Sequence, residues 1–122
     1  MVDLIKTSFH ITEKIKELEE GRQSLQEAAF KKAQSAADYE KRLAVTILKL
    51  RNGVKMALED TEIENPPVTI LERVARGICW EALLEKDKNE AFYKNIIQNL
   101  ECIKAELNGF QSINRFLSET EQ

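Results

Sequence analysis

Apolar side chains recur at seven-residue steps through the first half of this chain. Seven-residue spacing is typical of a helix that packs along a seam against other helices. We therefore expect a helix over residues 3–51, with Gly21 as the position where it is weakened or broken. The first series is Leu4, Ile11, Leu18, Leu25, Lys32 and Tyr39, and the companion series is Ser8, Ile15, Arg22, Ala29, Ala36, Leu43 and Leu50.

The composition agrees with a long-helix fold. The chain has 122 residues, of which 32% are charged and 43% apolar, with four Gly and two Pro. Few helix breakers and many charged residues favour helices over a sandwich or a disordered chain. A chain of this length fits one domain, so we expect a single, mainly all-α domain over residues 1–122.

A connector is expected over residues 52–68. Asn52 and Gly53 tolerate the left-handed conformation that ends many helices. Residues 54–63 then alternate in polarity, which indicates two short strands in a β-hairpin or, alternatively, an irregular loop. The two prolines, Pro66 and Pro67, require extended backbone before the next element.

A second long helix is predicted over residues 69–108. Thr69 and Glu72 have the spacing of a capping box, so Thr69 is the expected N-cap. Gly109 is expected to end this helix, and a short helix follows over residues 110–118. The two long helices would form a helical hairpin.

Part of the first helix has an apolar stripe that the second helix need not cover. Such a surface is usually buried against another copy of the chain, which predicts a coiled-coil-like homo-oligomer. The alternative is a hairpin with a loosely held N-terminal arm. The residues assigned to the oligomer interface are Leu4, Ile11, Ile15, Leu18 and Leu25.

Signatures of catalysis or of metal and cofactor binding do not appear in the sequence. The single histidine, His10, has no neighbouring partner for acid–base chemistry, and the acidic run over residues 59–64 lacks calcium-loop spacing. Cys79 and Cys102 match no metal or redox spacing and read as reduced residues of a cytoplasmic protein. No apolar run resembles a secretion signal or a membrane span. We expect no enzyme activity, no metal, no cofactor and no membrane contact.

Positive charge is concentrated in residues 31–58. This segment holds seven cations and two anions, a net charge of +5, within a chain of net charge −3. At about 100° per residue, Lys31, Arg42 and Lys49 fall within about 20° of one another on a helix. We call these three residues the basic ridge. The cations assigned to nucleic-acid binding are Lys31, Lys41, Arg42, Lys49, Arg51, Lys55, Arg73 and Arg76.

A ridge of this kind suits the backbone of a nucleic acid, because Lys and Arg bind phosphates without reading bases. The alternative is a solvated cationic face that is balanced by glutamates on a neighbouring helix. The residues alone leave both interpretations open.

Three segments, "LKLRNG", "ERVARGICW" and "IKAELNGFQSINRFL", resemble small proteins encoded by phages and prophages of Gram-positive bacteria, among replication and recombination genes. The order of elements over residues 25–118 is also similar to the UvsY family of phage recombination mediators. The shared features are a basic helix that ends at a Gly, a connector, a long second helix and a Gly–Phe step into a short basic helix. The acidic net charge and the connector "MALEDTEIENPP" depart from that pattern.

The resemblance implies a non-catalytic accessory protein of DNA recombination or replication in the host cytoplasm. UvsY proteins form ring-like oligomers, bind single-stranded DNA and help to load a recombinase. A recombinase, an annealing protein or a single-strand-binding protein is then an expected partner. The alternative function is a phage protein–protein interaction module, a scaffold or an inhibitor of a host factor, that does not bind DNA.

Overall fold

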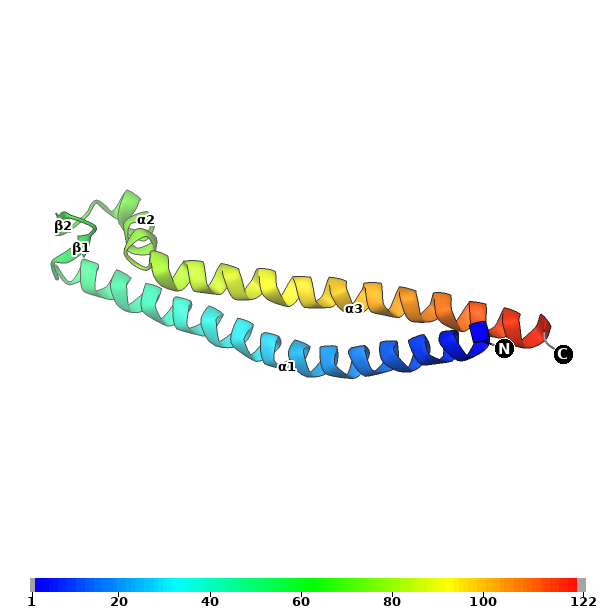
Figure 1. Ribbon diagram of the computed structural model, residues 1–122. Helices are drawn as coiled ribbons and strands as arrows, with labels where there is room; N and C mark the ends of the chain where they lie inside the picture. The colour runs from blue at the N-terminus through cyan, green and yellow to red at the C-terminus, as the bar shows by residue number, and fades with distance from the viewer. Residues whose placement is uncertain (1, 121–122) are drawn as a thin grey trace. The chain divides into compact units, whose positions relative to one another are not determined.

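The computed structural model describes residues 2–120, which are mainly helical and include a two-stranded sheet. The predicted all-α class is thereby confirmed, whereas the helical hairpin, the oligomer and the single domain stay predictions. The elements are α1 (Val2–Arg51), β1 (Met56–Leu58), β2 (Thr61–Ile63), α2 (Val68–Ile78) and α3 (Trp80–Thr120) (Figure 1).

The chain divides into two compact units, which are described separately. The terminal unit is Met1–Ala29 with Phe92–Gln122, and the central unit is Phe30–Ala91. Each unit therefore takes one part of α1 and one part of α3. No helix within residues 2–120 combines the length and the apolar character that a bilayer crossing requires.

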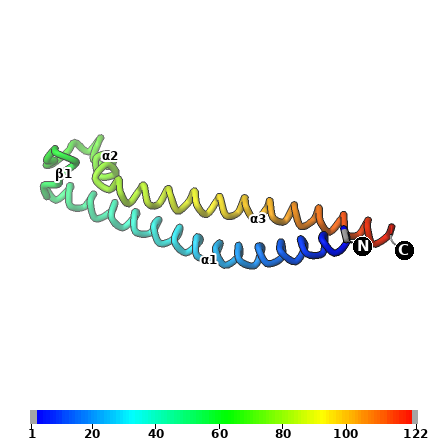
Figure 2. Tube along the Cα trace, viewed as in Figure 1, coloured from blue at the N-terminus to red at the C-terminus, as the bar shows by residue number. Residues whose placement is uncertain are grey.

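In the terminal unit, α1 and α3 lie side by side and antiparallel (Figure 2). The rings of His10 and Phe110 stack with their centroids 4.9 Å apart. Lys14 Nζ lies 2.5 Å from Glu106 Oε2 and 3.1 Å from Glu17 Oε2. The hydrogen bond to Glu106, followed by that to Glu17, raises the pKa of Lys14 above its ordinary value.

Gly21 does not interrupt α1, so the predicted weak point is not a break. A Cβ atom added at Gly21 would overlap the side chain of Leu100, which is buried. The glycine therefore permits a close approach between two helices, and the favourable packing offsets its low helix propensity.

The end of α1 at Asn52 and Gly53 is confirmed. Gly53 has φ +79°, its N–H donates to the Leu50 carbonyl, and the Val54 N–H donates to the Lys49 carbonyl. These two bonds define a Schellman motif, which satisfies carbonyls that the helix leaves open.

The connector forms the predicted β-hairpin and not an irregular loop. β1 and β2 pair antiparallel, with Met56 opposite Ile63 and Leu58 opposite Thr61. Residues 59 and 60 make the turn, in which Glu59 has φ +54°. A non-glycine residue in this left-handed region costs about 1 kcal/mol.

The prediction that Thr69 caps the second helix is wrong. Pro67, with φ −53° and ψ 143°, occupies the N-cap position, and α2 begins at Val68 without a side-chain cap. The fixed φ of proline and its missing N–H suit a helix start, so the helix begins one residue earlier than the capping box indicates.

The predicted helix over residues 69–108 is interrupted at Cys79, which separates α2 from α3. Cys79 has φ −90° and ψ 21°, and its N–H still donates to the Ala75 carbonyl. α2 packs on the β-hairpin, where Gly77 lies close enough to Leu58 that an added Cβ would stand 3.3 Å from Leu58 Cδ2. The break at Cys79 lets the chain leave this packed position and begin α3.

Gly109 does not end a helix, and residues 110–118 are not a separate one, because α3 continues to Thr120. Nothing lies within 4 Å of an added Cβ at Gly109. Phe110 stacks on His10, and Ser8 Oγ donates to Asn114 Oδ1 over 3.4 Å. These contacts follow Gly109 along the chain and the Lys14–Glu106 ion pair precedes it, so α3 is held along α1 on both sides of the glycine within the terminal unit.

The core of the central unit forms where α1, α2 and the start of α3 meet. Leu50 is 1% exposed, and its burial contributes about 2 kcal/mol. Leu43, Ile47 and Leu50 point inward as the sequence predicts. The buried residues of this core are Tyr39, Leu43, Leu50, Leu71, Ala75, Cys79 and Ala82.

Two of the helical glycines, Gly21 and Gly109, predict opposite effects of the same substitution. Gly21→Ala should lower the free energy of unfolding by about 1–2 kcal/mol, because overpacking against Leu100 exceeds the gain in helix propensity. Gly109→Ala, the matched control, should raise it by about 0.5–1 kcal/mol. Urea unfolding followed by circular dichroism measures both. In a Leu100→Ala background Gly21→Ala should become stabilising; an unchanged sign there would contradict the packing argument.

The hairpin turn gives a second prediction. Glu59→Asn should raise the free energy of unfolding by about 0.5–1 kcal/mol, because Asn tolerates positive φ better than Glu. Asp60→Asn is the control, since it removes one carboxylate from the same turn at a residue whose φ is not positive. Thermal melts compare the two variants, and equal shifts would mean that charge, and not backbone conformation, decides the effect.

Candidate nucleic-acid interface

A groove runs along α1 in the central unit. One wall is α1 and the other is formed by the end of α2 and the start of α3. Two open hollows of about 580 and 490 Å³ make up this groove. They adjoin, because Asp38 and Ala82 line both.

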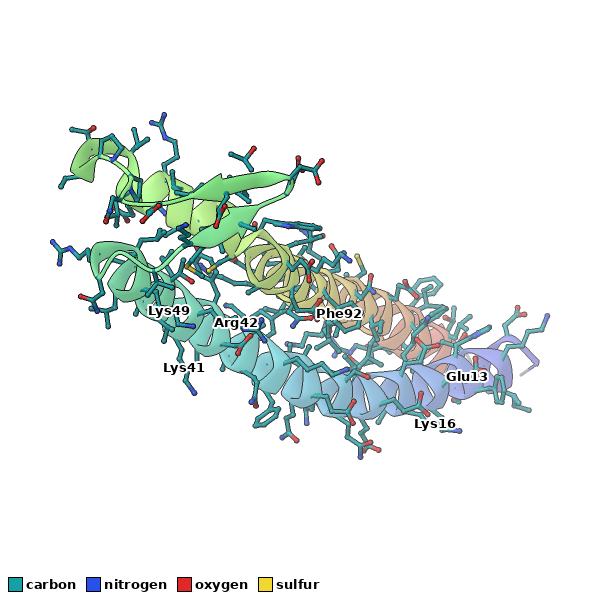
Figure 3. The ribbon with its side chains drawn as sticks, turned by 90° about the vertical axis from the view of Figure 1, so that its left-hand side faces the viewer. Glu13, Lys16, Lys41, Arg42, Lys49 and Phe92 are labelled. Atoms are coloured by element: carbon teal, nitrogen blue, oxygen red, sulfur yellow. The ribbon has the colours of Figure 1, made fainter. Side chains whose placement is uncertain are left out.

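Four of the eight predicted cations line the groove. Lys41, Arg42 and Lys49 border the first hollow and Lys31 borders the second. Figure 3 shows Lys41, Arg42 and Lys49 along the same stretch of α1. Each of the four residues is exposed. The basic ridge predicted from helical spacing therefore lies along one groove.

Carboxylates share this groove with the cations. Arg42 Nε donates to Asp38 Oδ2 over 3.0 Å, one helical turn away. Glu81 and Glu85 of α3 line the wall opposite α1. The lining thus holds four cations and three anions, which leaves a small positive charge. This is the glutamate balance that the sequence analysis left as the alternative.

Lys31, Lys41 and Lys49 remain without an ion pair among residues 2–120. An exposed ammonium group without a carboxylate partner is available to an external anion. The groove therefore has anion-binding capacity in spite of its acidic wall.

The floor of the groove includes Thr46 and Cys79. Thr46 Oγ1 donates to the Arg42 carbonyl over 2.8 Å and lies 3.3 Å from Cys79 Sγ. Both residues are buried. The Thr46 hydroxyl uses its proton on the Arg42 carbonyl and its oxygen can accept from the Cys79 thiol, so both polar groups are satisfied although they are buried where α1 meets the α2–α3 junction.

The other four predicted cations lie elsewhere in the central unit. Arg51 ends α1, and Lys55 Nζ lies 3.9 Å from Glu64 Oε2 beside the hairpin. Arg73 and Arg76 are exposed on α2, and Arg76 donates to Glu72 over 2.7 Å. None of the four lines either hollow of the groove.

Trp80 is an aromatic residue that the sequence analysis did not assign to the site. It is the first residue of α3, is 53% exposed, and lies in the chain between Cys79 and Glu81, which both line the groove. The apolar spacing of the predicted second helix does not include Trp80, because Trp80 lies at the helix break.

The residues predicted for an oligomer interface divide into two groups. Leu4, Ile11, Leu18 and Leu25 are half-buried on the helix face that also carries Lys14 and Gly21, the residues that meet α3 in the terminal unit. Ile15 is exposed. Packing within the terminal unit thus accounts for part of the heptad pattern, and the interface stays a prediction.

Within residues 2–120 no cluster of three His, Cys, Asp or Glu side chains could hold a metal ion. Cys79 and Cys102 are free thiols, buried and exposed respectively.

Comparisons of the chain with protein-family models, with curated proteins and with solved structures found no match.

The acidic wall makes a testable prediction about anion binding. Removing the charges of Glu81 and Glu85 by substitution with Gln should raise the affinity for a labelled single-stranded oligonucleotide about fivefold, since each surface charge contributes about 0.5 kcal/mol. The control pair, Glu62→Gln with Glu101→Gln, makes the same change in net charge outside the groove. Fluorescence anisotropy measures both, and equal gains would show that net charge alone controls binding.

Proposed function

We propose that this protein is a non-catalytic accessory of phage DNA recombination or replication, of the mediator type. It binds single-stranded DNA through the basic ridge and acts with a recombinase, an annealing protein or a single-strand-binding protein. It works in the host cytoplasm as an assembly of several copies.

The observation that carries this proposal is the alignment of four cations along one groove. Three of them, Lys31, Lys41 and Lys49, have no internal ion pair among the described residues. Their spacing along α1 follows the direction of the groove at steps of about 10–16 Å, so one strand lying in the groove can meet successive cations with phosphates that are not adjacent. The resemblance to UvsY proteins supports the same role.

The mechanism is positional. Ammonium and guanidinium groups release counterions from phosphates when they bind, which supplies affinity without base reading. The groove is open to solvent along its length. A strand held there by its backbone keeps its bases accessible to a recombinase.

A protein–protein interaction module is the second candidate, and the acidic wall favours it. Glu81 and Glu85 face the ridge cations across the groove. A mixed lining of this kind suits a partner helix that carries both signs of charge, such as one from a host factor. Such a scaffold or inhibitor would bind no DNA.

Anisotropy titration with a labelled single strand at several salt concentrations tests the DNA role. With three or four phosphate contacts, the logarithm of the association constant should fall against the logarithm of salt concentration with a slope of about −2 to −3. Changing Lys31, Arg42 and Lys49 together to Ala should lower affinity at least tenfold and reduce the slope to about −0.7, the value for the one contact that Lys41 can still make.

A matched triple variant separates site from net charge. Changing Lys6, Lys88 and Lys104 to Ala removes three exposed cations outside the groove. It should leave most of the affinity and the salt slope intact. If wild type binds no single strand at low salt, or if the two triple variants lose affinity equally, the DNA role is wrong and the interaction module stands.

A further inference from the structure

A stripe of exposed apolar residues follows α1 in the central unit. Its two largest members are Phe30, 69% exposed, and Leu48, 58% exposed. Three alanines between them are also exposed. We call this set the outer stripe; its members are Phe30, Ala33, Ala37, Ala44 and Leu48.

The outer stripe lies on a side of α1 that differs from both the basic ridge and the buried face. At about 100° per residue, it lies about 130° from the basic ridge and about 125° from the buried face of Leu43 and Leu50. Of its members only Phe30 also lines the groove. DNA in the groove would therefore reach Phe30 at most, and the rest of the stripe is available to another partner.

Its composition favours another helix as this occupant. The spacing of Phe30, Ala33, Ala37 and Ala44 is three, four and seven residues, which is the spacing of one packing seam. Alanines along the middle allow two helix axes to approach closely, and the larger Phe30 and Leu48 can pack at the ends.

Charge along α1 identifies the helix. Residues 30–51 contain six cations and two anions, whereas residues 3–29 contain four cations and six anions. The earlier segment also exposes apolar side chains, Ile5 at 65% and Phe9 at 61%. It is thus acidic, has exposed apolar side chains near its N-terminal end, and is complementary in charge to the segment that carries the outer stripe.

We propose that the outer stripe binds the residue 5–27 segment of α1 from a second copy of this chain. The two segments run antiparallel, because this direction lets both copies pair acidic with basic segments at once in a closed dimer, whereas in-register parallel helices would set basic against basic. In this direction Glu19 and Glu20 of the second copy lie opposite Lys41 in a register that sets Phe9 opposite Arg51, about one helical turn beyond Leu48. This deepens the self-association within the proposed function by naming its surface, and it needs no DNA.

Light scattering coupled to size exclusion, on the full chain without nucleic acid, tests the contact. Wild type should show at least twice the monomer mass of 14.0 kDa at about 100 µM. Ala37→Glu should lower the association constant at least tenfold, because it places a charge in the middle of the seam. Ala91→Glu, at an exposed alanine of α3 in the same unit, should leave the mass unchanged.

Charge reversal tests the pairing of the two segments. A variant with Lys41→Glu and Arg51→Glu should be monomeric, and so should a variant with Glu19→Lys and Glu20→Lys. An equal mixture should associate again, because each variant keeps the segment that the other one needs. Circular dichroism checks that each variant is folded.

Three results would overturn the inference. They are a monomeric wild type at every concentration, an Ala37→Glu variant that assembles like wild type, and a mixture of the charge variants that stays monomeric. If the Ala37→Glu variant still assembles, self-association uses another surface of the chain. The proposal that the protein works as an assembly of several copies would then still hold. DNA binding is measured in a separate titration. A failure of the DNA role can therefore be distinguished from a failure of the contact between copies.

Discussion

The burial of Leu50 and Ala75 in one small core is the interaction on which the central unit depends. Both are at most 1% exposed, and they bring the last turns of α1 against α2. The Schellman motif at Gly53 and the hairpin return the chain over this core, and the break at Cys79 lets α3 start beside α1. The groove exists because these three changes of direction occur within about thirty residues.

The same arrangement explains why the groove carries both signs of charge. The α1 wall contributes the basic ridge, whose three cations are spaced for one helix face, and the α3 wall contributes Glu81 and Glu85. A cationic strip on an isolated helix would attract any polyanion. Opposite an acidic wall the cationic strip is more selective. Only an anionic ligand that contacts the α1 side closely gains more energy from the cations than it loses by repulsion from the carboxylates. Weak, salt-sensitive binding is what such a surface supports.

Local chemistry explains which parts of the fold could be predicted. The correctly predicted features are the end of α1 at Asn52–Gly53, the hairpin, and the inward direction of Leu43 and Leu50. Each of them depends on residues that are close together in the sequence. Cys79 has no helix-breaking side chain, so its break follows only from tertiary packing. Gly109 predicts the end of a helix, but the contacts of Phe110 and Asn114 with α1 keep the chain helical beyond it. The ridge followed from helical spacing, whereas its acidic counterpart lies about forty residues away along the chain and gave no local signal.

Trp80 makes the break at Cys79 observable by fluorescence. It is the only tryptophan of the chain, it is half-exposed, and both of its neighbours along the chain line the groove. Indole emission shifts with the polarity of its surroundings. The native chain therefore has a built-in fluorophore at the junction of α2 and α3, where a strand, a partner helix or a change in the break itself alters the light that it emits.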